Sequence, residues 1–186
     1  IFGPMSVFNG EQEPAHKVVE DYGTLTTVVH GLWALNYKIV FTIGSWDLLH
    51  IGHVRYLRNA RAEGDVLVVG VDSDEVVKRY KGPLRPVVPY EERLEMLTYQ
   101  SCVNLVTKIE DVDEQGKWMY GLIRAINPDV FVAVEDSYPP DQLTEIGKYC
   151  KRLTVLPRQA ERTSTTRMIQ GAVKMHLTEM LKLLEK

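Results

Sequence analysis

The sequence predicts a single α/β domain built around a doubly wound, mostly parallel sheet. Short β-branched runs that are apolar on both faces alternate along the chain with segments of helical periodicity. The 186 residues are enough for one domain with a proper core and too few for two large ones. A long amphipathic segment at the C-terminal end predicts a final helix after the last strand.

The predicted strands are short apolar runs bounded by turn residues. They cover residues 38–43, 65–71, 129–134 and 153–156. Strand and helix alternate, and two parallel strands joined through a helix require a right-handed crossover. The sheet is therefore expected to be Rossmann-like, with a ligand site at the carboxyl ends of its strands.

Six segments have the spacing of helices. They cover residues 23–36, 54–62, 90–100, 120–126, 142–151 and 165–186. The first ends in Asn36, a residue type that tolerates the left-handed conformation at a helix C-terminus. The last can pack on its own domain or on a second subunit, and the sequence does not decide between these arrangements. We expect a homodimer.

Composition and charge limit the classes of function. The net charge is −3 without a basic block, which argues against a nucleic-acid partner. No apolar stretch reaches the roughly 18 residues of a membrane span, and no signal sequence opens the chain, so we expect a cytoplasmic protein. Cys102 and Cys150 lie far apart without a metal-ligand spacing and are expected to be reduced core residues.

The pattern divides the chain into three parts. Residues 1–4 end in Gly-Pro before Met5, which is typical of a cleaved expression tag, and are excluded from the fold. Residues 5–19 carry little periodicity and are expected to form a loose N-terminal extension. Residues 20–186 are expected to form the functional domain.

A histidine pair follows the first predicted strand. In the stretch FTIGSWDLLHIGHVRYLRNA, His50 and His53 flank Gly52 where a helix is expected to begin. Free backbone N–H groups and the positive end of the helix dipole favour an anion there. Gly44 and Gly52 have no side chain that would keep a phosphate from the backbone. Two imidazoles could donate hydrogen bonds to oxygens that gain charge during displacement at phosphorus.

A purely structural interpretation of the same histidines is that they cap and pack the start of a helix. We favour the functional interpretation, because Gly44, Asp47 and Gly52 occupy the same turn. A lone histidine would favour the structural one.

Two further groups of residues are typical of phosphate binding. Hydroxyl side chains begin the last predicted helix, where they can act as N-caps or contact phosphate; they are Ser164, Thr165 and Thr166. Basic side chains collect in residues 76–94, a span rich in proline and glycine; they are Lys78, Arg79, Lys81, Arg85 and Arg93. This span fits a solvated basic loop or a flexible lysine loop that supplies counter-charge to a nucleoside triphosphate.

Together these residues resemble the cytidylyltransferase-like nucleotidyltransferases. The pattern is Gly44-x-x-Asp47-x-x-His50-x-Gly52-His53, then Tyr80-Lys81-Gly82, Glu92-Arg93 and Ser164-Thr165-Thr166. The resemblance covers roughly residues 38–169 and identifies residues 20–186 as a nucleotidyltransferase domain. Residues 78–94 are most similar to the adenylyltransferase that makes ADP-heptose. Residues 132–137 and 156–166 are more similar to glycerol-3-phosphate cytidylyltransferase and its choline- and ethanolamine-phosphate relatives.

The resemblance implies that the phosphate of a small acceptor attacks the α-phosphorus of a nucleoside triphosphate and releases pyrophosphate. It implies that His50 and His53 stabilise the transition state and that Lys81 neutralises phosphate charge. The nucleotide-binding residues that it implies are Ile43, Gly44, Ser45, Trp46, Asp47, Gly52, Arg93, Asp136, Arg158, Ser164, Thr165 and Thr166. Mg²⁺ would bridge the phosphates with few protein ligands, and no residue is predicted to bind a metal.

We expect CTP rather than ATP as the nucleotide. Leu156-Pro157-Arg158 and Asp136 match the cytidylyl branch, whereas the lysine loop that matches the adenylyl branch touches phosphate and is a poorer guide to the base. The acceptor is expected to be a polyol, sugar or amino-alcohol phosphate. The alternative is an ATP-dependent adenylyltransferase of the ADP-heptose synthase type.

Two other functions are considered. A non-catalytic nucleotide-binding regulator is disfavoured, because a sensor needs affinity without the transition-state groups His50, His53 and Lys81. A class I aminoacyl-tRNA synthetase shares the histidine motif, but the chain lacks room for a tRNA-binding domain and has no Lys-Met-Ser-Lys-Ser loop.

Three positions depart from the patterns of these families. Ser45-Trp46 stands where a small residue and phenylalanine are usual, and the bulkier indole is expected to reshape the acceptor pocket. Residues 133–135 are Ala-Val-Glu instead of the lysine-glycine-glycine loop of the heptose enzymes, which argues against heptose phosphate. Arg158 lies six residues before Ser164, one more than in the cytidylyl pattern.

Overall fold

The computed structural model describes residues 13–115 and 117–184 and contains a five-stranded parallel sheet. Its strands are β1 (Ile39–Gly44), β2 (Val66–Asp72), β3 (Leu105–Ile109), β4 (Val130–Val134) and β5 (Arg152–Leu156). Their spatial order is β3-β2-β1-β4-β5, so the direction of winding reverses at β1. Ligands bind at such a switch point in doubly wound sheets. The predicted α/β fold is confirmed.

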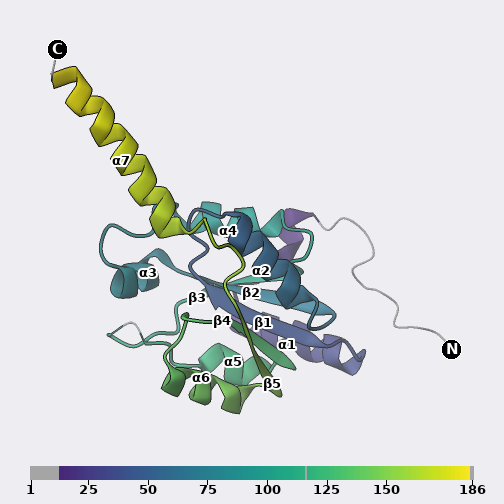
Figure 1. The fold of residues 1–186 in the computed structure, drawn as a ribbon. Helices are drawn as coiled ribbons and strands as arrows, with labels where there is room; N and C mark the ends of the chain where they lie inside the picture. The colour runs from purple at the N-terminus through teal and green to yellow at the C-terminus, as the bar shows by residue number, and fades with distance from the viewer. Residues whose placement is uncertain (1–12, 116, 185–186) are drawn as a thin grey trace.

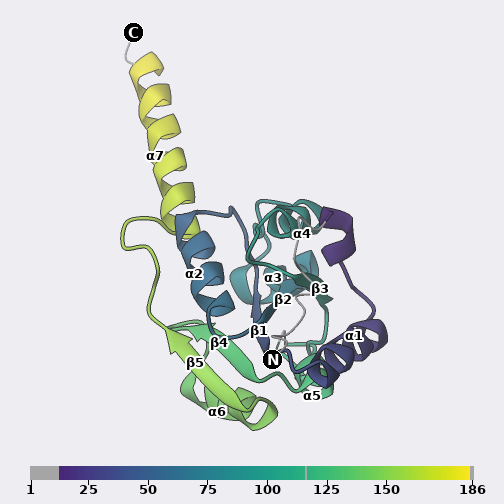
Figure 2. The same ribbon diagram turned by 90° about the vertical axis from the view of Figure 1, so that its right-hand side faces the viewer.

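Helices cover both faces of the sheet (Figures 1 and 2). The helices α2 (Ile51–Arg61) and α4 (Tyr90–Thr98) pack on one face. The opposite face is covered by α1 (Tyr22–Ala34), α5 (Gly121–Ile126) and α6 (Pro140–Ile146). Two short 3₁₀ helices, η1 (Pro14–Lys17) and η2 (Gly147–Tyr149), complete these layers. Asn36 follows α1 with a φ of 63°, the left-handed conformation expected from the sequence.

Successive side chains of a strand point to opposite faces of the sheet and pack in different hydrophobic clusters. Ile39 and Phe41 of β1 pack with α1 and α5, whereas Val40 packs with α2. All three side chains are fully buried, which explains why the strand is apolar on both faces. Cys102 and Cys150 were expected in the core; they are free thiols that are only partly buried at its margins.

The sequence pattern does not predict two elements, β3 and the helix α3 (Asp74–Lys81). The span expected to be a flexible lysine loop therefore begins as a helix. Ser73 caps α3 by accepting the N–H of Val76, and Gly82 ends it with a φ of 93°. Only Val76 and Val77 of its eight residues are buried, so the helical periodicity is hidden among charged side chains.

Residues 13–19 are packed on the domain rather than loose. The N–H of Val19 donates to the carbonyl of Val106 at 2.9 Å, which extends the β3 edge of the sheet. Lys17 is 6% exposed, and its ammonium group donates to the carbonyl of Gln100. The expected tag remnant and residues 5–12 of the expected extension lie outside the described residues.

The last helix, α7 (Thr165–Leu184), projects from the domain (Figures 1 and 2). None of its residues is buried. Its apolar side chains, among them Met168, Val173, Leu177, Met180 and Leu184, are 41–82% exposed. Packing of this helix on its own domain was one of the two arrangements that the sequence left open, and the structure does not show it. The homodimer stays a prediction. Among the described residues, no helix is both long and apolar enough to cross a bilayer.

Removal of the Tyr56 hydroxyl is expected to destabilise the fold. This buried hydroxyl donates to the carbonyl of Val132 at 2.7 Å and lies 2.7 Å from the hydroxyl of Thr42, so it joins α2 to β4 and β1. Tyr56→Phe leaves a buried carbonyl without its donor and should lower the free energy of unfolding by about 1–2 kcal/mol in urea denaturation. The matched control Tyr99→Phe, at a 62% exposed tyrosine, should change it by less than about 0.5 kcal/mol. Equal stability of the Tyr56 variant and the wild type would contradict this role.

Candidate active site

A cavity of about 1040 Å³ lies at the carboxyl ends of the strands. Its walls come from the β1–α2 turn, the end of α3, the β4–α6 turn and the start of α7. The volume is at the upper limit of the range of about 300–1,000 Å³ typical of ligand pockets, which leaves room for two small substrates. Every predicted site residue lines this cavity except Asp47 and Arg93.

His50 and His53 cap the start of α2. The Nδ1 of His50 accepts the N–H of Gly52 at 3.1 Å, and the Nδ1 of His53 lies 3.4 Å from the N–H of His50. The two rings stack with centroids 4.0 Å apart. The structural interpretation of the pair is thus correct, and it does not compete with the functional one.

The capping bonds fix the chemistry that each ring offers. Because Nδ1 accepts a backbone N–H, the proton of each neutral imidazole is on Nε2. Burial lowers the pKa of His50, and burial together with the nearby His50 and Lys81 lowers the pKa of His53 to about 3. Near pH 7 both rings are therefore neutral N–H donors lining the cavity.

The buried indole of Trp46 packs against the ring of His53. Its indole N–H donates to the carbonyl of Gly70 at 2.9 Å, and its ring lies edge-on to His53 with centroids 5.6 Å apart. The side chain is 4% exposed. The indole forms part of the core beneath the β1–α2 turn and also lines the cavity, and its effect on an acceptor pocket stays a prediction.

Glycine is required at two positions of this turn by close contacts. A Cβ at Gly52 would lie 2.9 Å from the His50 ring and 3.1 Å from Ala160. A Cβ at Gly44 would lie 3.2 Å from the indole of Trp46. A side chain at position 52 would force the His50 ring to shift, and one at position 44 would crowd the Trp46 indole.

Lys81 reaches the cavity from the last position of α3. Its ammonium group donates to the Ser45 hydroxyl at 2.7 Å, so the two predicted residues meet although 36 residues separate them. Burial and the neighbouring Arg85 guanidinium lower the pKa of Lys81. Lys81 and Arg85 line the same cavity as the histidines, and the sequence indicated Arg85 only as part of a basic span.

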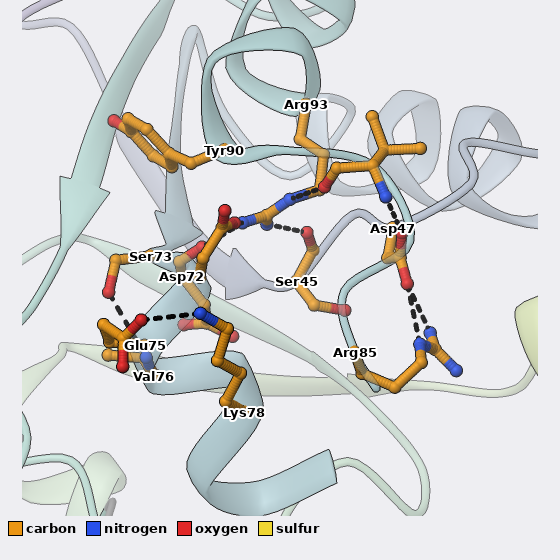
Figure 3. Close-up of polar contacts among 12 residues, drawn as sticks. Ser45, Asp47, Asp72, Ser73, Glu75, Val76, Lys78, Arg85, Tyr90 and Arg93 are labelled. Carbon is orange, nitrogen blue, oxygen red and sulfur yellow. Dashed lines mark hydrogen bonds and ion pairs between the residues drawn. The ribbon is translucent and has the colours of Figure 1, made fainter. Parts of the chain in front are cut away.

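Asp47 anchors the β1–α2 turn: its carboxylate points toward Arg85 (Figure 3), and the residue is not among those that line the cavity. Its carboxylate is fully buried and accepts the N–H groups of Val87 and Val88. It also pairs with Arg85 at 2.6 Å. Although burial alone would raise it, the pKa of Asp47 is lowered by these backbone donors and by Arg85. Asp47 was predicted to bind nucleotide, but its carboxylate is engaged by Arg85 and backbone N–H groups and does not line the cavity.

Arg93 is a buried anchor as well. Its guanidinium, 1% exposed, donates to the carbonyls of Ser45 and Asp72 and to the Asp74 carboxylate, and also to the carbonyl of Val88 (Figure 3). It therefore clamps the end of β1 to the end of β2 and to the start of α3. Arg93 was predicted to bind nucleotide, but it does not line the cavity.

The start of α7 closes the opposite wall. Ser164 accepts the N–H of Arg167, and the hydroxyl of Thr165 donates to the carbonyl of Asp47 at 2.9 Å. Together with Thr166 they line the same cavity as the histidines, as predicted. The 20-residue helix leaves free N–H groups at this end, where its dipole favours anions.

The two residues predicted near the base pair with each other. The Nε of Arg158 donates to Asp136 at 3.0 Å, and both side chains are at least 60% exposed. The backbone N–H of Arg158 donates to Glu135. Both side chains line the cavity, near the ends of β4 and β5.

The chain matches the model of the cytidylyltransferase-like family over residues 41–171. It belongs to that family. Its curated relatives include Bifunctional protein HldE of Helicobacter pylori (strain P12), which is 40% identical over 139 residues. Bifunctional protein HldE of Trichlorobacter lovleyi is 31% identical over 174 residues. These matches cover 75% and 91% of this chain but only 28% and 34% of the relatives.

Solved structures show the same fold. A lipopolysaccharide core biosynthesis protein from Thermoplasma volcanium GSS1 matches with a TM-score of 0.54 and 23% identity over 66% of this chain and 96% of the other. Pantoate-beta-alanine ligase from Francisella tularensis matches with a TM-score of 0.54 and 15% identity over 77% and 67%. The Rossmann-like fold predicted from the sequence is thereby confirmed.

The low pKa of His53 predicts a pH dependence of stability. In the unfolded chain histidine binds a proton below about pH 6.5, whereas the folded ring binds one only near pH 3. Between about pH 6.5 and pH 3 the unfolded state therefore binds more protons than the folded state. The free energy of unfolding decreases by up to about 1.4 kcal/mol for each unit by which the pH is lowered. His53→Gln should flatten the decline of the Tm between pH 6.5 and 4.5, and His176→Gln on exposed α7 should not. Equal slopes for wild type and His53→Gln would refute this.

Arg93→Lys is expected to destabilise the domain strongly. Lysine keeps the charge but cannot reach the separate oxygens that the guanidinium contacts, and the Asp72 and Ser45 carbonyls lose their donor. We expect a loss of about 3–5 kcal/mol in chemical denaturation. Arg152→Lys, at the more exposed ion pair with Glu63, is the control and should cost less than about 1 kcal/mol. A small effect at Arg93 would show that the clamp is not needed for folding.

Proposed function

We propose that this domain transfers a nucleoside monophosphate from a nucleoside triphosphate to a small phosphorylated acceptor and releases pyrophosphate. The supporting observation is the pair of neutral Nε2–H donors of His50 and His53, which line one cavity with Lys81 and the start of α7. Preorganised donors of this kind stabilise charge that develops in a transition state.

The shape of the cavity suggests how the substrates lie. The β and γ phosphates fit the start of α7, at Ser164 to Thr166, and the histidines then face the α-phosphate. Lys81 and Arg85 supply positive charge where the acceptor phosphate meets the α-phosphorus. The attacking oxygen belongs to the acceptor, so the protein supplies positioning and electrostatics without a covalent intermediate.

We infer that the nucleotide is ATP, and we set aside the CTP predicted from the sequence. The curated relatives are HldE proteins, the ADP-heptose synthase type that residues 78–94 resemble. The CTP prediction depended on Asp136 and Arg158, and these side chains satisfy each other in an ion pair. They therefore provide no support for a pocket made for cytosine.

The nucleotide would enter as its Mg²⁺ complex. Among the described residues, no group of three or more histidine, cysteine, aspartate or glutamate side chains could hold a metal. The buried Asp47 carboxylate is already engaged by Arg85 and two backbone N–H groups. The ion would take its ligands mainly from phosphate oxygens and water, which suits Mg²⁺.

Removal of either histidine should slow the reaction more than it weakens binding. His50→Ala and His53→Ala are each expected to lower kcat about a hundredfold or more, with a much smaller change in KM. Lys81→Ala should weaken ATP binding as well, because it meets charge that is already present in the ground state. The histidine variants should also lose about 1 kcal/mol of stability with the cap, so Tm is measured on the same preparations. A fully active histidine variant would overturn the mechanism.

The choice of nucleotide is tested by pyrophosphate release. Purified protein is assayed with ATP and with CTP, in Mg²⁺, against heptose 1-phosphate, glycerol 3-phosphate, phosphoethanolamine and phosphocholine. We expect ATP to be used at least about tenfold more efficiently than CTP, a difference of roughly 1.4 kcal/mol. Thermal shifts with each nucleotide give an independent comparison, since a ligand of the folded state raises the Tm. A preference for CTP in both assays would contradict this inference and support CTP, the nucleotide predicted from the sequence.

A further inference from the structure

A short segment before α1 lies against the β3 edge of the sheet. This edge segment, residues 13–20, extends β3 through the N–H of Val19, which donates to the carbonyl of Val106. Lys17 also fastens it by donating to the carbonyl of Gln100 at 3.1 Å. None of its residues lines the cavity, and the proposed reaction gives it no role. Its last residue, Glu20, nevertheless makes a contact that leads toward the site.

Glu20 accepts a hydrogen bond from the hydroxyl of Tyr90 at 2.5 Å. Tyr90 is the first residue of α4 and is 8% exposed. Burial and the Glu20 carboxylate raise the pKa of Tyr90, so its hydroxyl stays protonated and donates near pH 7. This hydrogen bond therefore ties the exposed edge segment to the buried start of α4.

The ring of Tyr90 lies against Arg93, three residues further along α4. The guanidinium carbon is 5.9 Å from the ring centroid, and the ammonium nitrogen of Lys108 is 5.1 Å from it. Figure 3 shows the ring beside the guanidinium, with its hydroxyl pointing away from it. Both cations also have carboxylate partners, Asp74 and Glu110 respectively. The ring therefore orients the guanidinium, whose counter-charge comes from elsewhere.

Arg93 carries the connection into the cavity wall. Its guanidinium donates to the carbonyls of Ser45 and Asp72. The hydroxyl of the same Ser45 accepts from the Lys81 ammonium group at 2.7 Å, and both of these side chains line the cavity. A continuous series of contacts thus runs from the edge segment, through Tyr90 and Arg93, to the lysine that meets phosphate in the proposed reaction.

We propose that Glu20 and Tyr90 are positioning residues through which the edge segment controls the affinity of the site for the triphosphate. This proposal rests on the proposed function and adds a means of regulation to its nucleotide site. When the segment is docked, the Tyr90 ring is fixed, and Arg93 holds Ser45 where Lys81 meets phosphate. When the segment is released, the ring turns more freely and the lysine is held less precisely. Segments at the edge of a fold open at a lower cost in free energy than its core, so docking and release can act as a control.

The test measures the Kd for ATP in Mg²⁺ by titration calorimetry, and kcat/KM by pyrophosphate release. Tyr90→Phe should raise the Kd about fivefold or more, within the range seen for residues that act on a site through intervening contacts. Glu20→Ala should have the same effect, whereas Glu20→Gln keeps an acceptor oxygen and should retain most of the affinity. In a Lys81→Ala background, Tyr90→Phe should change the Kd less than about twofold, because the group that it positions is absent.

Tyr22→Phe is the matched control. Tyr22 begins α1, directly after this part of the chain, and its hydroxyl donates to the carbonyl of Lys108 on β3 at 2.9 Å. Its loss removes a tyrosine hydrogen bond beside the edge segment but leaves the contact between Tyr90 and Arg93 in place. Tyr22→Phe should lower the Tm, as Tyr90→Phe does, yet leave the Kd for ATP within about twofold of wild type.

The proposal is overturned if Tyr22→Phe and Tyr90→Phe weaken ATP binding equally, or if Tyr90→Phe weakens it as much without Lys81 as with it. A wild type that binds ATP but releases no pyrophosphate with any acceptor contradicts the proposed function, and the Kd values still decide the positioning role. A wild type that binds no ATP contradicts both.

Discussion

The buried carboxylate of Asp47 holds the site together. Its fully buried oxygens accept two backbone N–H groups from the 85–88 segment and pair with Arg85, and its backbone carbonyl accepts from Thr165 at the start of α7. One residue thus joins the β1–α2 turn, the 85–88 segment and the last helix. A charge buried this deeply is tolerated only when it is paired and hydrogen-bonded, and its donors are then fixed in space.

Arg93 plays the corresponding role on the other side of the turn. It binds the carbonyls at the ends of β1 and β2 and the carboxylate near the start of α3, so it joins the strand ends to α3. Lys81 stands at the other end of α3, and its position relative to the histidines follows from this clamp. The groups that face the substrate are therefore held by buried groups that do not touch it, a division typical of preorganised sites.

The neutral hydrogen-bond donors of the site and its cations are different side chains. The histidines are neutral, because burial and the nearby cation make a second positive charge costly, while Lys81 and Arg85 remain the cations. In the proposed reaction, such cations would attract the triphosphate already in the ground state. Neutral N–H donors add stabilisation mainly where new negative charge develops, which favours the transition state over the bound substrate.

The sequence by itself determined four of the five strands, the histidine turn and the hydroxyl-rich start of the last helix, because each is encoded locally as an apolar run, a short motif or a cap. It also brought residues as distant as Gly44 and Ser164 into one predicted site, through the family resemblance. It could not show that α3 is a helix, since only two of its residues face the core, nor that β3 completes the sheet. Only the tertiary structure decided that Asp47 and Arg93 are anchors and that Asp72 and Tyr80 line the cavity, because burial and pairing depend on segments far apart in the chain.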